Sequence, residues 1–210
     1  MSISRYAFEP APSSLSVRRL LGDVGGADHT VIMRVLLKLV LDCDPDAAWR
    51  AIRSPAVFRE VSSPLVEIES LAADGFPTVW EPGQHPVEMR GGGVIPMGKQ
   101  IIRLNFETRQ HGDVRIVHDS GQGVTGAVST IKLWDHQMAI APDPAGTGKT
   151  LYRDQLRIGA GVLTPFAWYS LWAFWQWRGR KLQQLAPTWA YDLPQADEEA
   201  PEVGAEAAGA

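Results

Sequence analysis

The stretch that most constrains the fold lies near the C-terminus: "TPFAWYSLWAFWQWRGRKLQQLAP", residues 164 to 187. Thr164 is a suitable N-cap, Pro165 suits the first helical position, and Pro187 ends the helix. Apolar or small residues recur at helical spacing along one stripe: Trp168, Leu171, Trp172, Trp175, Gly179 and Leu182. The sequence therefore predicts one long helix, a rod about 33 Å in length, against which the rest of the chain must pack.

Ahead of this helix the apolar residues alternate with a period of two. From Val31 to Leu41 every second residue is apolar, which predicts a long strand with one core face. "DCDPDAAWRAIRSPAVFREVS" changes to helical spacing, with Asp44 as a cap, and Pro55 divides it into two short helices. Further strand-like pieces follow, separated by Gly and Pro: Val66–Leu71, Thr78–Trp80, Val87–Arg90, Gln100–Thr108, Val114–His118, Gly126–Ile140 and Thr150–Ile158.

Turn chemistry lies between several of these pieces. Pro96, Met97 and Gly98 are interpreted as the turn that leads into the strand from Gln100. His118 and Asp119 precede "SGQG", where a turn is favoured and the mouth of a cavity is the alternative. These segments place the strands in succession, as in a meander of antiparallel strands.

"APDPAGTGKT", residues 141 to 150, resembles the phosphate-binding loop of nucleotide enzymes, G-x-x-x-x-G-K-[ST]. Asp143 stands at the position of the first glycine, where a carboxylate would face the phosphate. The residues that follow, "TLYRDQLRI", alternate with a period of two, whereas a phosphate-binding loop is followed by a helix. The segment is therefore interpreted as a hairpin connection, and we expect no nucleotide partner.

The hairpin brings polar residues together on an apolar face. With the loop centred near Ala145, the parity of the strand pairing predicts these neighbours: Asp154 near His136, Tyr152 near Met138, and Leu156 near Trp134. A paired imidazole and carboxylate inside a cavity can orient a ligand or transfer a proton. An internal pair that orders the hairpin is the simpler interpretation. A catalytic acid–base role for His136, Asp154 and Tyr152 is the alternative.

Several stretches are similar to those of one superfamily. "LVLDCDPDAAWRAIRSPAVFREV" resembles its opening strand and Asp-Pro-started helix, and "TLYRDQLRIGAGVLTPFAWYSLWAFWQWRGRKLQQL" resembles its last strand, with a Tyr-x-Asp element, and long helix. "MRGGGVIPMGKQIIRL" and "LWDHQMAI" resemble its middle strands. Over about residues 30 to 190 the chain thus resembles the START/Bet v 1-like (SRPBCC) superfamily, with its polyketide cyclase/dehydrase and lipid-transport members.

This resemblance implies an α+β helix-grip fold. A curved antiparallel sheet of about six to seven strands would wrap around the long C-terminal helix, with two short helices after the first strand. A cavity between sheet and helix would hold an apolar small molecule. The superfamily has no invariant catalytic motif to carry over, so the resemblance implies no particular reaction.

Two functions follow from the expected cavity. The first is binding or carriage of a hydrophobic small molecule, such as a lipid, a polyketide or an aromatic metabolite. The second is a polyketide cyclase, aromatase or dehydratase that uses cavity acid–base residues. We expect these residues to contact the ligand: Leu104, Phe106, Trp134, His136, Met138, Tyr152, Asp154, Leu156, Trp168, Leu171, Trp172 and Trp175. No residues have metal-ligand spacing, and no cofactor is expected.

A third function, an interaction module, follows from the first half of the long helix, which is apolar nearly all round: Phe166, Trp168, Tyr169, Leu171, Trp172, Phe174, Trp175 and Trp177. One sheet covers only one side of a helix, so the remaining rings must meet the N-terminal arm, a second chain or a membrane surface. "WQWRGRK" adds Arg178, Arg180 and Lys181, a mixture that suits a membrane interface. A homodimer is preferred over membrane contact.

Charge and composition limit the remaining possibilities. The net charge is −4, and no long basic run exists, which argues against nucleic acid as a partner. Residues 1–28 are expected to form a partly ordered arm, 29–191 the ligand-binding domain, and 192–210 an acidic disordered tail. The single cysteine, Cys43, excludes an intrachain disulfide. With no secretory signal or spanning segment recognised, a cytoplasmic protein is the expectation.

Overall fold

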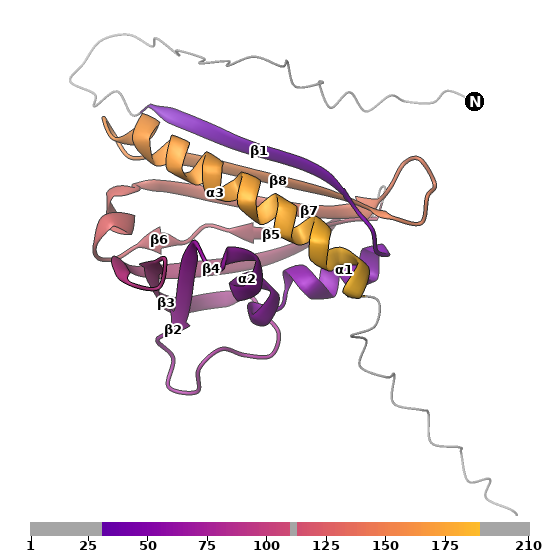
Figure 1. Ribbon diagram of the computed structural model, residues 1–210, viewed down its shortest axis with the longest axis horizontal. Helices are drawn as coiled ribbons and strands as arrows, with labels where there is room; N and C mark the ends of the chain where they lie inside the picture. The colour runs from indigo at the N-terminus through magenta and orange to yellow at the C-terminus, as the bar shows by residue number, and fades with distance from the viewer. Residues whose placement is uncertain (1–30, 110–112, 190–210) are drawn as a thin grey trace, which may run out of the picture.

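An antiparallel sheet and one long helix make up most of the structure, a computed structural model that describes residues 31–109 and 113–189 (Figure 1). The strands are β1 Ile32–Leu41, β2 Val66–Ser70, β3 Gly83–Gly91, β4 Ile95–Arg109, β5 Val114–Asp119, β6 Gln122–Gly123, β7 Leu133–Pro142 and β8 Thr150–Gly159. The helices are α1 Pro45–Ile52, α2 Pro55–Ser62 and α3 Thr164–Leu185, with 3-10 turns η1 Ala127–Thr130 and η2 Ala186–Thr188. The expected arm (1–28) and tail (192–210) lie outside the described residues.

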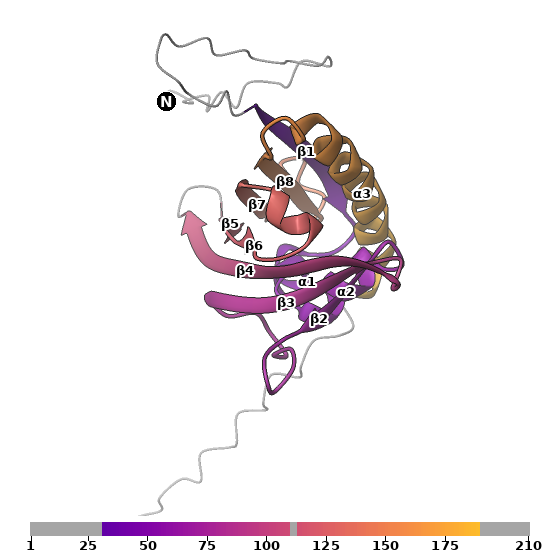
Figure 2. The same ribbon diagram turned by 90° about the vertical axis from the view of Figure 1, so that its left-hand side faces the viewer.

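The sheet is open and curved, and its strands run in the order β1-β8-β7-β5-β4-β3-β2, with β6 paired to β4 off this path. Seven strands on the main path agree with the expected six to seven, and the two-residue β6 adds an eighth. α3 lies across the sheet, next to β1 and α2 (Figures 1 and 2). The fold is therefore α+β, with a long C-terminal helix and two short helices after the first strand.

The first strand and the two short helices form as the sequence predicts. In β1, Val35 and Leu41 are buried while the alternate residues from Ile32 to Val40 are exposed. α1 begins after Asp44, whose carboxylate accepts hydrogen bonds from the backbone N–H groups of Asp46 and Ala47 at 2.9 and 2.8 Å. Ser54 caps α2 in the same way. These caps confirm the two helices.

The segment that resembled a phosphate-binding loop is the connection between β7 and β8. β8 begins at Thr150 as a strand, so the hairpin interpretation is confirmed. The exact register differs from the expected one by two residues: Tyr152 lies opposite Ile140, Asp154 opposite Met138, and Leu156 opposite His136. Because a shift of two preserves the parity, the same side chains still share the inner face.

Four local expectations are wrong. Thr78–Trp80 is not a strand; Trp80 packs its ring against Phe58 and Phe76 from a loop outside the sheet. Pro96–Gly98 lies within β4, because Gly92 and Gly93, both with positive φ, supply the β3–β4 turn. The segment 126–132 carries η1, and β7 begins only at Leu133. The N-cap of α3 is Leu163, because the Thr164 hydroxyl bonds the preceding loop at Ala160 and Gly161.

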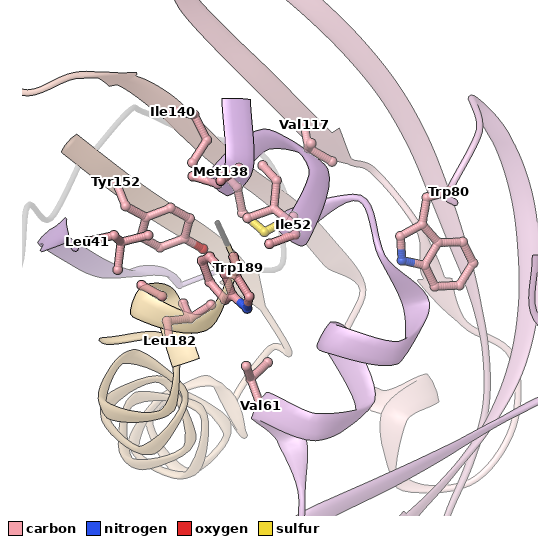
Figure 3. Close-up of a cluster of buried hydrophobic side chains, with 14 of the residues drawn as sticks. Leu41, Ile52, Val61, Trp80, Val117, Met138, Ile140, Tyr152, Leu182 and Trp189 are labelled. Atoms are coloured by element: carbon pink, nitrogen blue, oxygen red, sulfur yellow. The ribbon is translucent and has the colours of Figure 1, made fainter. Parts of the chain in front are cut away.

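The main core cluster joins both short helices, the sheet and the end of α3. Figure 3 shows part of this cluster: Ile52 and Val61 from the short helices, Val117, Met138, Ile140 and Tyr152 from the sheet, and Leu182 from α3. A second cluster packs Val35, Leu156 and Ile158 against Trp175. Among the described residues, no helix combines the length and the apolar character needed to cross a bilayer.

Candidate functional site

A cavity of about 680 Å³ lies between the sheet and the helices α2 and α3. Most of its wall is apolar, with side chains from every strand on the main sheet path except β1 and β8. Its polar wall residues are few: Ser62, Gln100, Asp119, Thr130, His136, Ser170 and Arg178. An apolar pocket with a few converging polar groups is the usual form of a small-molecule site.

Asp154 is the centre of the polar network behind the cavity wall. Its Oδ1 accepts hydrogen bonds from His136 Nε2 and Trp175 Nε1, both at 2.9 Å. Its Oδ2 accepts one from the Tyr152 hydroxyl at 2.7 Å and lies 3.9 Å from Arg178 Nη1. The residue is 1% exposed. A buried carboxylate is stable as an anion only when donors surround it in this way.

The surroundings of Asp154 set the ionisation of this network. Burial acts to raise the pKa of Asp154, but the charge and hydrogen bond of His136, the charge of Arg178 and the Trp175 hydrogen bond outweigh it and lower this pKa to about 2. Burial, and then the charge of Asp154, hold the pKa of Tyr152 well above its usual value. At neutral pH the carboxylate is therefore ionised and the phenol stays protonated, so Tyr152 acts as a donor and not as a base.

His136 joins this network to the cavity. Its Nε2 carries a proton, because the ionised carboxylate of Asp154 can only accept. Among the described residues Nδ1 has no hydrogen-bond partner, and the ring lies in the cavity wall. The rings of Trp134 and Trp175 pack against the imidazole at centroid distances of 6.2 and 5.3 Å. With Nε2 held by Asp154, the imidazole leaves Nδ1 for a hydrogen bond with a bound molecule.

Arg178 is the second charged group of the wall, and sequence reasoning misplaced it. The sequence placed Arg178 in a basic, aromatic segment suited to a membrane interface, but only 5% of the residue is exposed. Its guanidinium lies near the rings of Trp175 and Phe58 and donates from Nη2 to Met138 Sδ at 3.2 Å. Its Nε has no hydrogen-bond partner within the described part of the chain. Sulfur is a weak acceptor. The buried cation therefore retains donors for an oxygen of a ligand.

Asp119, at the end of β5, is a further site residue that the turn interpretation missed. It is the β-sheet partner of His136, and it lines the cavity. Its Oδ1 accepts from the backbone N–H groups of Arg103 and Gly121, and its Oδ2 from Trp134 Nε1 at 2.8 Å. The alternative prediction for this segment, a position at the cavity, is therefore correct for Asp119. The sequence indicated it only through an Asp in the strand that neighbours His136.

The expected ligand contacts divide into two sets. Seven residues line the cavity: Leu104, Phe106, Trp134, His136, Met138, Leu171 and Trp175. The other five do not: Tyr152, Asp154, Leu156, Trp168 and Trp172.

Two packing reasons account for the five residues outside the wall. The three β8 residues are buried behind the wall, since α3 and β7 side chains lie between them and the cavity. Trp168 and Trp172 are turned away from the cavity: Trp168 Nε1 donates to the backbone carbonyl of Arg34 in β1, and Trp172 stacks on Trp168. Cavity-facing positions of α3 include Leu171, Trp175, Arg178 and Leu182, which recur at helical spacings of three and four.

Comparison with known proteins names no family for this chain: no family model matches it, and no curated protein matches it. Similar solved structures include a protein of Chromobacterium violaceum, 17% identical, covering 73% of this chain and 97% of that chain with a TM-score of 0.48. A Thermus thermophilus protein is 11% identical, with coverages of 77% and 100% and a TM-score of 0.48. A Nitrosospira multiformis protein is 10% identical, with coverages of 76% and 99% and a TM-score of 0.48. Matches of this strength assign neither a family nor a function to the chain.

Proposed function

We propose that the protein binds or carries a hydrophobic small molecule in the cavity beneath α3. The observation that carries this proposal is an apolar cavity of about 680 Å³, within the range of roughly 300–1,000 Å³ that ligand pockets occupy. A lipid, a polyketide or an aromatic metabolite has the apolar surface to fill it. The helix-grip assignment and membership of the START/Bet v 1-like superfamily are part of the same proposal, and the order of elements supports them.

The polar groups in the cavity wall limit the chemical classes of ligand that fit. Among the described residues Arg178 Nε has no hydrogen-bond partner, and His136 offers Nδ1 as an acceptor or, once protonated, as a donor. An apolar molecule with one oxygen-bearing group, such as a carbonyl or carboxylate, would satisfy Arg178 while its hydrocarbon part contacts the apolar wall. A ligand without such an oxygen would leave the guanidinium unsatisfied.

Binding is tested with N-phenyl-1-naphthylamine, a neutral apolar probe whose fluorescence rises in an apolar site. We expect saturable binding of about one probe per chain. Leu104→Trp puts a larger side chain on the cavity wall and should weaken binding at least about tenfold, because the ring occupies the probe's volume. Leu36→Trp, on an exposed position of β1, is the matched control and should bind as the wild type does. Equal affinities of the two variants would exclude the cavity as the binding site.

A second function, acid–base catalysis of a cyclase or dehydratase type, is favoured by one observation. Nε2 of His136 is held by the ionised Asp154, and the ring forms part of the cavity wall. Nδ1 is thus left for a substrate proton, as a general base requires. Arg178 lies beside the same carboxylate and is suited to stabilise an oxyanion on a carbonyl substrate. Tyr152 and Asp154 lie behind the wall, so they would position His136 without touching the substrate.

The catalytic proposal has its own test. A short poly-β-ketone thioester is incubated with the wild type and with His136→Gln, and products are identified by mass spectrometry. Cyclised or dehydrated product from the wild type, at least about a hundredfold slower with the variant, would support His136 as the base. If neither protein changes the substrate while both bind the apolar probe, the chain is a binder and the catalytic proposal is rejected.

A further inference from the structure

Three uncharged stretches border one opening of the cavity. They span residues 91–98, 120–131 and 158–177, and none contains Asp, Glu, Lys, Arg or His. Each contributes to the cavity wall, through Met97, Thr130 and Phe166 among others. The three are neighbours in space, since Lys99 N donates to Thr125 Oγ1 at 3.0 Å and Lys132 N to Gly159 O at 2.7 Å. In Figure 1 this rim lies on the left, where α3 begins, and Figure 2 looks towards it.

The rim carries large apolar side chains in contact with solvent. Val94 is 80% exposed, Val162 90% and Phe166 75%, and Ile95 and Tyr169 are also exposed. An apolar group of this kind around a cavity mouth marks a surface that meets a partner or a membrane. The rim includes Phe166 and Tyr169 from the first half of α3, where the sequence predicted an interaction surface, and leaves out the basic segment from Arg178 to Lys181.

Two basic side chains flank the rim, together with the exposed Glu67 beside Gly93 and the buried Asp119. Lys99 and Lys132 directly follow two of the uncharged stretches, and both are exposed. Among the described residues neither forms an ion pair with a carboxylate, and Lys132 Nζ donates only to the carbonyl of Ser129 at 2.8 Å. An apolar centre with free lysines at its border is complementary to a bilayer whose headgroups are anionic.

We propose that this rim docks the protein on an anionic lipid bilayer, with the cavity mouth facing the membrane. Valine and aromatic side chains would enter the headgroup region, while the lysines meet lipid phosphates. The orientation rests on the proposed function, because it lets an apolar ligand pass between bilayer and cavity without crossing water. A second copy bound to the same rim would instead cover Leu163 and Phe166 and close the mouth.

Vesicle flotation tests the docking surface. Full-length protein is mixed with vesicles of phosphatidylcholine, alone or with about a third phosphatidylserine, and the bound fraction is measured. We expect stronger binding to the anionic vesicles. Val94→Asp combined with Val162→Asp should lower the partition coefficient at least about tenfold. Leu36→Asp combined with Val40→Asp adds the same charge at exposed apolar positions of β1 and should bind as the wild type does.

Charge reversal separates the electrostatic part. One basic side chain near an anionic surface raises the partition coefficient about fivefold. The double variant Lys99→Glu/Lys132→Glu should therefore lower binding to anionic vesicles more than about twenty-fold. Its weak binding to phosphatidylcholine alone should stay unchanged. Equal partition of the rim variant and the β1 control would overturn the proposal. So would a wild-type dimer in gel filtration that Val94→Asp/Val162→Asp converts to a monomer, with no vesicle binding by either.

The docking and binding proposals can fail separately. None of the four substituted positions, Val94, Val162, Lys99 and Lys132, lines the cavity. N-phenyl-1-naphthylamine should therefore bind the wild type and both variants equally in the absence of vesicles. Absence of probe binding to a wild type that floats with anionic vesicles would reject the proposed function and leave the docking surface intact.

Discussion

Replacement of Asp154 by Asn removes the only negative charge within ion-pair distance of Arg178 among the described residues. Asn keeps the shape, its amide oxygen can accept from Trp175, and its NH₂ group can donate to a rotated Tyr152 hydroxyl. Arg178, however, stays buried with one sulfur acceptor and no counter-charge. Since loss of one partner from a buried ion pair costs about 3–5 kcal/mol, we expect Asp154→Asn to lower the free energy of unfolding by an amount in that range.

The loss in the free energy of unfolding is measured by urea denaturation at pH 7, followed by circular dichroism. The slope of this free energy against urea concentration should be the same in wild type and variant. A double variant identifies the cause. Arg178→Met keeps an unbranched side chain among Met138, Phe58 and Trp175, so Asp154→Asn/Arg178→Met has no unpaired charge and should be more stable than Asp154→Asn alone. A loss below about 1 kcal/mol for Asp154→Asn, or a double variant no more stable than it, would refute the role of the charge pair.

Two further predictions concern pH and backbone packing. The pKa of Asp154 is lowered from 3.8 to about 2, which corresponds to a contribution of about 2 kcal/mol to the free energy of unfolding. This contribution should be complete above about pH 4 and be lost as the pH falls towards 2. Urea titrations over this range should show a steeper loss of stability in the wild type than in Asp154→Asn. Gly98→Ala should lower the free energy of unfolding by about 1–3 kcal/mol, because a Cβ there collides with the carbonyl of Thr125 at a positive φ. Gly148→Ala, also at positive φ but with open space around it, should cost less in the same assay, and equal losses would contradict the collision.

Period and parity explain why the inner face of the hairpin could be predicted from the sequence. The alternation of residues 150–158 excluded a helix after Lys149, and the turn residues set the parity of pairing. Parity alone is enough to bring His136 and Asp154 to one face, where they form a hydrogen bond of 2.9 Å. The register itself depends on how many loop residues join the ladder, which composition does not determine, and so it differed by two.

Local patterns failed where tertiary contacts decide the structure. Trp80 looks like part of a strand because it follows Thr78 and Val79, but its ring completes an aromatic cluster that needs no neighbouring strand. Pro96 and Gly98 have the composition of a turn, yet the glycines before them turn the chain first and β4 continues past both. Propensity ranks the local conformations, and long-range packing selects among them.

The position of Arg178 is the part of the site that the sequence pattern could not predict. α3 is apolar on most of its circumference, so its sequence does not say which stripe faces the sheet. The rotation is set by Gly179, whose Cα approaches the Leu37 and Leu39 side chains of β1 so closely that an added Cβ would lie 3.3 Å from Leu37. With Gly179 against β1, Arg178 next to it in the chain turns towards the cavity and the carboxylate of Asp154. Arg178 thus becomes the buried cation of the site, because the adjacent Gly179, which has no side chain, lets α3 pack closely against β1.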